Sequence, residues 1–374
     1  MRPKIAVYGN QHMNLGHAVA ADLTLAGHEV TVFDLPEHGN TIAPLLDMGG
    51  IHVSGNPKAL VSGKTGFAKP HRISTDPEEA LRGVDLLFID VPTDAFETRL
   101  EPIIPYIRDG AVLHFNYYGY WPSLRVAPLL RKAGKGGVMV TECPTCLYYA
   151  RGKEGRLTFE VMKERVSLSV FPAVRTAEAF RVMRAAYPNF EPAQNVLATN
   201  FENLNLLWHP AIALLNAAHF DREKERGEKT AYFYQTGITE HTACLSEAQD
   251  RERESLCNAY GVPYHSLRDL TRQYVAGTGK TMTEVQRSSN FIQGSPAFDV
   301  DQWARWICWD MPLGVVPMVL LADLAGVPLP IHRGLVDIFG ALLETDFWKT
   351  GLTLERLGLA GFSVREVLDY VTQG

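Results

Sequence analysis

The feature that most constrains this fold is a regular alternation of strand-like and helix-like segments along the first 195 residues. The strand-like segments are short and almost entirely apolar, and they cover residues 5–8, 29–33, 85–91, 111–115 and 137–141. Segments with helical periodicity lie between them, for example at residues 17–26 and 76–81. Near-continuous apolar strands that alternate with helices are typical of a parallel sheet covered on both faces. We therefore predict an α/β domain for residues 1–195.

The second part of the chain has a different pattern. After about residue 195 the alternation stops, and residues 200–218, 239–260 and 312–325 all have helical periodicity. We therefore predict an all-α domain for residues 196–374. A length of 374 residues accommodates two domains of this kind.

The composition narrows the classes of partner. An apolar fraction of 46% and a charged fraction of 21% are typical of a soluble globular protein. The net charge of −6, with no basic stripe, argues against nucleic acid and anionic membranes as partners. No signal-peptide pattern precedes the first strand, and the longest apolar stretch, residues 315–322, is too short to span a bilayer. We expect a cytoplasmic protein.

Cysteines and charge runs give no sign of a metal site. The five cysteines include one CxxC, Cys143 to Cys146, which no second CxxC or HxxxH accompanies. We interpret this pair as reduced thiols in a packed loop after a strand, and we predict no metal. The mixed-charge runs at residues 222–226 and 250–254 are expected to form solvated helix faces or loops.

The first strand, the helix after it and the second strand have the order of a dinucleotide-binding unit. The usual G-x-G-x-x-G is replaced by a longer loop in which only the outer glycines remain, seven residues apart instead of five. A loop before a helix N-terminus lets a pyrophosphate approach backbone N–H groups. We assign cofactor binding to these loop residues: Gly9, Asn10, Gln11, Asn14 and Gly16.

The end of the second strand indicates which cofactor binds. Asp34 follows Gly9 by 25 residues, where a carboxylate can accept hydrogen bonds from ribose hydroxyls and repel a 2′-phosphate. Residues 35–39 contain no Arg or Lys, which favours NAD over NADP.

Two later strand ends support the same site. Val91 and Pro92 close one strand and Asn116 follows the next, and the carboxyl ends of parallel strands are where open α/β sheets bind ligands. Ordinary loop capping is the alternative explanation for Asn116. The predicted fold is thus an N-terminal Rossmann-type parallel-sheet domain followed by an all-α domain.

The helical half contains a candidate proton-transfer group. Asn205 and His209 are four residues apart and share a helix face, and Pro210 should kink the helix beside them. Histidine suits proton transfer because its pKa lies near neutrality. A histidine that is merely satisfied within the core is the alternative.

About one hundred residues later, Arg305 and Asp310 add a guanidinium and a carboxylate. Pro312 suggests that a helix begins near Asp310, with Asp310 as its N-cap, so that a break lets both side chains face one cleft. An Asp beside a His fixes the imidazole tautomer, and an Arg can bind a carboxylate in bidentate fashion. A structural ion pair with a helix cap is the alternative.

These two strings, Asn205 to Pro210 and Arg305 to Pro317, resemble those of the octopine/nopaline (opine) dehydrogenase family. The similarity covers nearly the whole chain, and residues 75–80, 141–151 and 354–359 also match family patterns. The resemblance implies a Rossmann domain, a helical domain and a reaction in which NAD(P)H reduces the imine formed from a 2-oxo acid and an amine.

The resemblance also implies roles for individual residues. His209 would be the general acid/base, Asp310 its carboxylate partner and Arg305 an anion-binding or network residue. Asn205 would hold the substrate or the histidine. Glu142, within the matching stretch 141–151, is placed in the cofactor site.

We therefore predict an NAD(P)H-dependent oxidoreductase that reductively condenses a 2-oxo acid with an amino acid or amine, or catalyses the reverse oxidation. NAD is the expected cofactor and a homodimer the expected assembly. Trp208, Trp306 and Trp309 suggest an amine with an apolar or aromatic side chain, unless they belong to the core. Two alternatives stay open: a 2-oxo or 2-hydroxy acid reductase on the same scaffold, and a nucleotide-binding regulatory protein that has lost catalysis.

Overall fold

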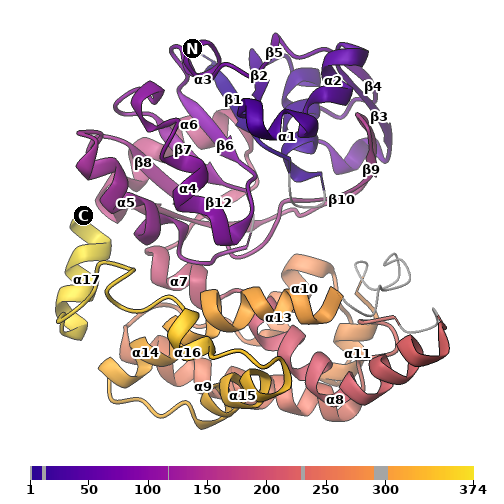
Figure 1. Cartoon of the computed structure of the whole chain (residues 1–374), viewed down its shortest axis with the longest axis vertical. Helices are drawn as coiled ribbons and strands as arrows, with labels where there is room; N and C mark the ends of the chain where they lie inside the picture. The colour runs from indigo at the N-terminus through magenta and orange to yellow at the C-terminus, as the bar shows by residue number, and fades with distance from the viewer. Residues whose placement is uncertain (1, 11–13, 117, 229–231, 290–301) are drawn as a thin grey trace. The chain divides into compact units, whose positions relative to one another are not determined.

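The chain divides into two compact units in a computed structural model that describes residues 2–10, 14–116, 118–228, 232–289 and 302–374 (Figure 1). Unit 1 comprises residues 1–199 together with 370–374, and unit 2 comprises residues 200–369. The division falls after residue 199 rather than after residue 195, and the last five residues belong to unit 1. The sequence pattern does not reveal this return, because it depends on contacts between distant parts of the chain.

Unit 1 is built on an eight-stranded sheet in the order β12-β11-β8-β7-β6-β1-β2-β5. Its strands are β1 (Ile5–Tyr8), β2 (Val30–Phe33), β5 (Arg72–Ser74), β6 (Leu86–Ile89), β7 (Val112–Phe115), β8 (Met139–Glu142), β11 (Val166–Phe171) and β12 (Phe190–Pro192). Neighbouring strands are parallel except for β8 and β11. The predicted class, a Rossmann-type parallel sheet followed by helices, is confirmed.

The order of the strands in the large sheet indicates where a ligand-binding crevice lies. Strand β1 lies between β2 and β6, so the connections run in opposite directions on its two sides. Such a switch point leaves a crevice outside the carboxyl ends of the two central strands. The loop after Tyr8 and the segment after Ile89 therefore border the expected cofactor position.

A second, four-stranded sheet in unit 1 has no counterpart in the sequence prediction. It has the order β4-β3-β10-β9 and consists of β3 (Ile51–Gly55), β4 (Gly66–Ala68), β9 (Tyr148–Lys153) and β10 (Arg156–Met162). Strand β10 alternates buried and exposed residues at its start, as a half-exposed strand does. The unit's helices are α1 (Leu15–Leu25), α2 (Ala43–Met48), α3 (Pro77–Leu81), α4 (Phe96–Leu100), α5 (Pro122–Lys132), α6 (Thr176–Ala186) and α7 (Val196–Phe201), the last of which crosses the unit boundary.

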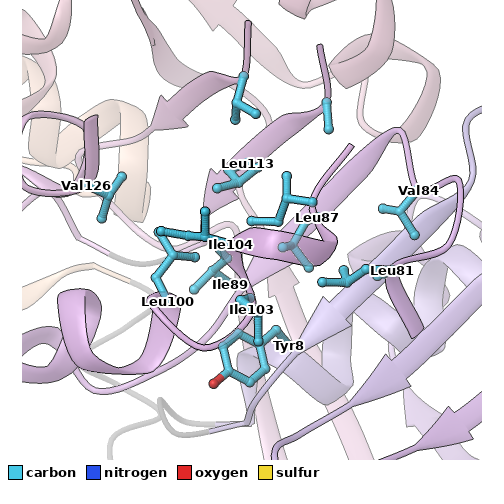
Figure 2. Packing of buried hydrophobic residues seen from close by; sticks show 14 of the residues in the cluster. Tyr8, Leu81, Val84, Leu87, Ile89, Leu100, Ile103, Ile104, Leu113 and Val126 are labelled. Carbon is cyan, nitrogen blue, oxygen red and sulfur yellow. The ribbon is translucent and has the colours of Figure 1, made fainter. Parts of the chain in front are cut away.

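The core of unit 1 lies between the large sheet and the segments that follow β6 and β7. Figure 2 shows Leu87 and Ile89 of β6 and Leu113 of β7 packing with Leu100 of α4 and Val126 of α5. All five are almost completely buried. This apolar layer fixes the carboxyl ends of the strands in a rigid frame, which is where the predicted cofactor residues lie.

Unit 2 is helical, as predicted. Its helices are α8 (Asn205–Arg226), α9 (Glu240–Ala259), α10 (Leu267–Val275), α11 (Met282–Arg287), α13 (Gln302–Asp310), the π-helix η6 (Met311–Val315), α14 (Val316–Leu324), α15 (Pro330–Leu342), α16 (Phe347–Thr350) and α17 (Val364–Gln373), which continues into unit 1. Among the described residues one stretch, Trp303–Leu324, has the length and hydropathy of a membrane span. Because 72% of that window is buried in the protein, we interpret it as a core element.

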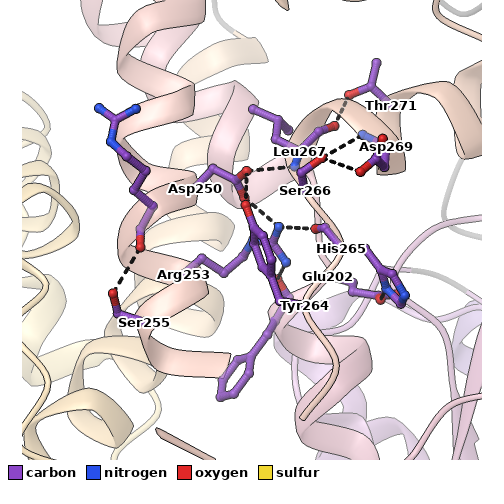
Figure 3. Close-up of polar contacts among 12 residues, drawn as sticks. Glu202, Asp250, Arg253, Ser255, Tyr264, His265, Ser266, Leu267, Asp269 and Thr271 are labelled. Carbon is purple, nitrogen blue, oxygen red and sulfur yellow. Dashed lines mark hydrogen bonds and ion pairs between the residues drawn. The ribbon is translucent and has the colours of Figure 1, made fainter. Parts of the chain in front are cut away.

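The charge run at residues 250–254 forms a solvated face only in part: Arg251 and Glu254 are exposed, as predicted, whereas Asp250 and Arg253 are buried. Arg253 is fully buried, and its Nε donates to Asp250 Oδ1 at 2.9 Å while its Nη2 donates to the carbonyl of His265 at 2.5 Å (Figure 3). Tyr264 Oη donates to the other Asp250 oxygen at 2.8 Å. The two opposite charges, three residues apart on α9, satisfy each other inside the unit, and alternating charge alone does not distinguish this from an exposed face.

Candidate active site

His209 lies on α8 one residue before Pro210, within a helix that remains continuous from Asn205 to Arg226. Proline has no N–H, so the carbonyl of Leu206 loses its normal helical partner. Gln249 of α9 replaces it, donating from Nε2 to that carbonyl at 3.0 Å. Ser246 Oγ donates to the next carbonyl, that of Leu207, at 2.9 Å. Helix α9 therefore holds the turn that carries His209.

The structure brings His209 and Asp310 together. His209 Nδ1 lies 2.8 Å from Asp310 Oδ2, and the two residues are 4% and 1% exposed. A carboxylate can only accept, so Nδ1 carries the proton and the imidazole tautomer is fixed.

The expected N-cap role of Asp310 is wrong. Asp310 ends α13 in a helical conformation with φ −62° and ψ −45°, makes no side-chain cap, and runs directly into the π-helix η6. A π-helical turn is wider than an α-helical one, and it carries Pro312 here without a break in the chain's helical course. Gly314 in η6 packs closely on α8, since a Cβ there would lie 2.3 Å from Leu206 Cδ2 and would displace that side chain. Close packing of η6 on α8 thus places Asp310 beside His209.

Tyr234 is a site residue that the sequence prediction missed. Its Oη lies 2.7 Å from His209 Nε2, and its side chain is 7% exposed. It belongs to the turn before α9, in the string Tyr232-Phe233-Tyr234, which has no fixed spacing relative to the histidine. Only this aromatic string could have drawn attention to it.

Aromatic rings enclose the imidazole. Trp306 stacks on His209 with ring centroids 4.9 Å apart and an interplanar angle of 17°, and Phe233 meets it edge-on at 5.6 Å. Trp208 packs edge-on against Tyr234 at 6.0 Å. Two of the three tryptophans noted in the sequence are therefore part of the histidine's surroundings.

Asn205 and Arg305 are not bound to the histidine ring. The backbone N–H of Asn205 donates to Asn203 Oδ1 at 3.1 Å, and among the described residues its side-chain amide makes no hydrogen bond. Arg305 is exposed on α13, five residues before Asp310. Their assignment to the catalytic site remains a prediction.

The cofactor loop depends on its two glycines. Gly9 follows β1 with φ +80°, and a Cβ there would lie 2.5 Å from the carbonyl oxygen of Asp90. A Cβ on Gly16 would lie 2.2 Å from the carbonyl oxygen of Gly9. Both positions need glycine because the start of α1 packs directly on the ends of β1 and β6.

The first N–H groups of α1 are already bonded to side chains. Asp90 Oδ2 accepts from the N–H of Gly16 at 2.6 Å, and Asn10 Oδ1 accepts from the N–H of His17 at 3.0 Å. Asn14 precedes the helix with φ 61° and receives a hydrogen bond from Asn10 at 3.2 Å. The predicted residue Gln11 lies outside the described residues. A buried carboxylate, Asp90, thus occupies the helix end that was expected to face a pyrophosphate, and the sequence prediction did not include it.

Asp34 differs from its expected role. Its side chain is fully buried and forms a short ion pair with Arg99 of α4. Thr41 Oγ1 and the N–H of Leu35 also donate to its carboxylate, at 2.7 and 2.9 Å. Burial raises the pKa of the Asp34 carboxyl, while the bonds to Thr41 and Arg99 act to lower it. Since Arg99 balances the charge of Asp34, this carboxylate repels a 2′-phosphate much less than an unpaired carboxylate would.

The strand ends after β6 and β7 fit a polar ligand. Within the described part of the chain, Thr93 Oγ1 and both amide atoms of Asn116 are buried without a hydrogen-bond partner. Val91 is buried and Pro92 is partly buried just before Thr93. Unpaired buried polar atoms are costly unless something binds them, so these groups fit the amide of a nicotinamide cofactor. Glu142, at the end of β8, accepts from the N–H of Ser123 at 3.1 Å.

The CxxC is a packed loop, as interpreted from the sequence. Cys143 and Cys146 are both buried, and neither is part of a disulfide among the described residues. Burial raises the pKa of the Cys143 thiol to about 12, which leaves it unreactive at neutral pH. In the portion of the chain that the structure describes, no group of His, Cys, Asp and Glu is arranged to hold a metal ion.

Comparisons with known proteins agree with this arrangement. Residues 192–343 match the model of the octopine/nopaline dehydrogenase family's alpha-helical domain, described as NAD/NADP octopine/nopaline dehydrogenase. An opine dehydrogenase from Arthrobacter sp. (strain 1C) is 28% identical over 96% of both chains.

Two solved structures share the fold over nearly the whole chain. An octopine dehydrogenase in complex with NADH and agmatine has a TM-score of 0.76 at 20% identity, covering 98% of each chain. A yersinopine dehydrogenase with NADP+ bound has a TM-score of 0.65 at 17% identity, covering 100% of this chain and 98% of that one. With the buried His209–Asp310 pair, these matches show that the chain resembles the octopine/nopaline (opine) dehydrogenases, whose alpha-helical domain is matched at residues 192–343, and that it is an NAD(P)-dependent dehydrogenase that acts on CH–NH bonds.

Proposed function

We propose that this protein condenses a 2-oxo acid with an amino acid or amine and reduces the resulting imine with NADH, or catalyses the reverse oxidation. The observation that carries the proposal is the buried Asp310–His209 pair, whose 2.8 Å hydrogen bond fixes the imidazole tautomer. Buried histidines with a carboxylate on one nitrogen are built to hold or move a proton through the other.

The residues divide between two tasks. Gly9 and Gly16 keep the first turn of unit 1 narrow, and Thr93 and Asn116 offer buried polar atoms to the cofactor amide. The cofactor, when bound, supplies a hydride to the carbon of the C=N bond. His209 supplies or removes the proton needed when the 2-oxo acid and the amine combine and lose water.

Two further residues complete the proposed substrate site. The Asn205 side chain, which makes no hydrogen bond among the described residues, is assigned to the substrate. Arg305 is assigned to an anionic group, since a guanidinium binds carboxylate or phosphate oxygens in bidentate fashion. The aromatic residues around His209 favour an amine with an apolar or aromatic side chain.

NADH is the proposed cofactor, and NADPH is the alternative. The Arg99–Asp34 pair means that a 2′-phosphate at this strand end meets a balanced charge, not a bare carboxylate. Similarly, a homodimer and a cytoplasmic location remain predictions from the sequence, as does the expectation that partners are small molecules.

The function is tested by following NADH oxidation in the purified protein. A panel of 2-oxo acids is supplied alone, and then with amino acids that carry charged, apolar or aromatic side chains, with NADPH in parallel. We expect oxidation only when an oxo acid and an amine are both present. Oxidation by the oxo acid alone would establish the 2-oxo acid reductase instead. NADH binding without any turnover would favour a regulatory protein.

A variant pair connects the activity to the site. His209→Gln should lose roughly 10²-fold or more in kcat/KM while it still binds NADH, because it removes the proton-transfer group. His219→Gln is the matched control, since His219 lies on the same helix and is exposed. Equal activity in the two variants would rule His209 out of the chemistry.

A further inference from the structure

Both nitrogens of the His209 ring are bonded to protein groups. Nδ1 lies 2.8 Å from Asp310 Oδ2 and Nε2 lies 2.7 Å from Tyr234 Oη. The three side chains form one chain of hydrogen bonds, and none of the three residues is more than 7% exposed. In this arrangement both ring nitrogens of His209 are occupied, and Tyr234 Oη lies at the opposite end of the hydrogen-bonded chain from the Asp310 carboxylate.

The tautomer fixes the direction of the outer hydrogen bond. Since Nδ1–H donates to the Asp310 carboxylate, Nε2 of the neutral ring has only a lone pair and accepts from the Tyr234 hydroxyl. When the ring is protonated, Nε2–H donates to the phenol oxygen, and the phenol's own hydrogen can then donate elsewhere. Each protonation state of His209 thus dictates whether Tyr234 offers a proton outward.

From this geometry we propose that Tyr234 is the catalytic residue that hands the proton to the substrate, with His209 as the reservoir behind it and Asp310 as the positioning carboxylate. The proposal rests on the proposed imine-forming function. As water leaves the adduct of oxo acid and amine, the lone pair of the amine nitrogen forms the C=N bond, and the C–O bond breaks with its electron pair going to the oxygen. That oxygen takes the phenol proton, Nε2–H passes its proton to the phenol oxygen, and the imidazole becomes neutral.

The turn that carries Tyr234 is held firmly on α8. Asn216 Nδ2 donates to the carbonyls of Ile212 and Gly237 at 2.8 and 3.1 Å, which ties the turn to the helix. Gly237 has no room for a side chain, because a Cβ would lie 2.7 Å from Ile212 Cγ2. Proton transfer needs such fixed donor–acceptor distances, so the turn suits a relay better than a mobile loop would.

Packing around the phenol ring adds to this restraint. Phe233 meets the Tyr234 ring edge-on at 5.0 Å and Trp306 stacks near it at 6.2 Å. The same Trp306 stacks on His209. The two rings of the relay therefore share one aromatic neighbour, and a rotation of either would disturb both.

Tyr234→Phe tests the relay, because it removes only the hydroxyl. We expect kcat/KM for imine reduction to fall roughly 10²-fold or more, with NADH binding unchanged. Tyr232→Phe, two residues earlier in the same segment, should keep the wild-type rate. If His209 acts on the substrate directly, Tyr234→Phe frees Nε2 and leaves the rate within about threefold of wild type or above it, which would overturn the relay.

A double-mutant cycle separates a relay from two independent groups. Residues that act in series give a double variant, His209→Gln with Tyr234→Phe, no slower than the slower single variant. Effects that multiply would contradict a relay. A second measurement replaces Tyr234 with 3-fluorotyrosine, which keeps the hydroxyl and makes it more acidic. The pH profile of kcat/KM must then shift, and a profile identical to wild type would also contradict the proposal.

The outcomes distinguish this proposal from the function on which it rests. A wild-type protein that reduces imines while Tyr234→Phe stays fully active loses the relay but keeps the function. A wild-type protein that oxidises NADH with the oxo acid alone, or that shows no turnover with any pair of oxo acid and amine, loses both the function and the relay.

Discussion

At the residue scale, we expect the proposed chemistry to depend on the negative charge of Asp310, which lies 2.8 Å from His209 Nδ1. Replacing it with Asn keeps the size but removes the negative charge that stabilises a protonated His209, and the amide can also favour the wrong tautomer. We expect kcat/KM of Asp310→Asn to fall roughly 10²–10⁴-fold, with NADH affinity within about twofold of wild type. Steady-state kinetics and NADH fluorescence titration measure the two quantities.

The control for this change is another aspartate of unit 2. Asp323 is exposed and pairs with Arg333 on the surface, so Asp323→Asn should leave the rate unchanged. A loss of NADH affinity as large as the loss of rate in Asp310→Asn would mean that Asp310 supports cofactor binding instead of proton transfer.

Some residues of the candidate site could be predicted from the sequence and others could not. His209 and Asp310 were predictable, because a histidine and an acid at a characteristic spacing match a family pattern. Tyr234 was not, since its approach to His209 depends on a turn packed against α8. Asp34 was assigned from its position after β2, but its partner Arg99 is 65 residues away in the chain. No local pattern reveals that pairing.

At the element scale, the start of α1 should tolerate no side chain at Gly16. A Cβ there would lie 2.2 Å from the carbonyl oxygen of Gly9, and backbone cannot move aside as a flexible side chain can. We expect Gly16→Ala to lower the free energy of unfolding by about 1–3 kcal/mol and to weaken NADH binding. Urea unfolding and a binding titration measure the two effects.

At another helical glycine, Gly334, we expect an added side chain to raise the free energy of unfolding. Gly334 lies within α15, where a Cβ would meet no atom within 4 Å. Gly334→Ala should therefore stabilise the protein by roughly 0.5–1 kcal/mol through helix propensity. Equal responses at Gly16 and Gly334 would show that the close approach of α1 to β1 is not present in solution.

Pro210 and Gln249 should be coupled in stability. Because Pro210 leaves the Leu206 carbonyl without a helical partner, Gln249→Met exposes that carbonyl to an apolar side chain and should cost about 1–2 kcal/mol. In a Pro210→Ala background the new N–H can bond the carbonyl, so the same change should cost clearly less. Urea unfolding of the four proteins gives the coupling energy directly. Equal costs in both backgrounds would mean that Gln249 does not serve the proline.

At the scale of the whole molecule, the sequence predicted the elements that local patterns of apolar residues determine. It missed the features that depend on contacts between distant segments of the chain. The parallel sheet follows from short strands that are almost entirely apolar, and the helical half follows from apolar residues that recur with a period of 3.6. The sheet β4-β3-β10-β9 pairs strands about one hundred residues apart, as between Val53 and Leu157, and its short strands have weak local patterns. The return of residues 370–374 to unit 1 has the same origin.

Acid sensitivity should arise from two neutral histidines buried in unit 1. Burial lowers the pKa of His114 to about 3 and that of His17 to about 4, against about 6.5 in an unfolded chain. Between these values the unfolded chain binds more protons, so the free energy of unfolding falls as pH drops from about 6.5 toward 4. Above about 6.5 both states are neutral at these positions and neither group adds a pH dependence.

Removing one of these groups should flatten the pH profile of stability. Each buried histidine contributes up to about 1.4 kcal/mol per pH unit within its window, so His114→Gln should reduce the slope by about that amount, whatever it does to the stability at neutral pH. Urea unfolding at several pH values measures the slope, with the exposed His219→Gln as control. A His114→Gln profile parallel to that of the wild type would mean that His114 is not held neutral in the folded protein, and that acid unfolding begins elsewhere.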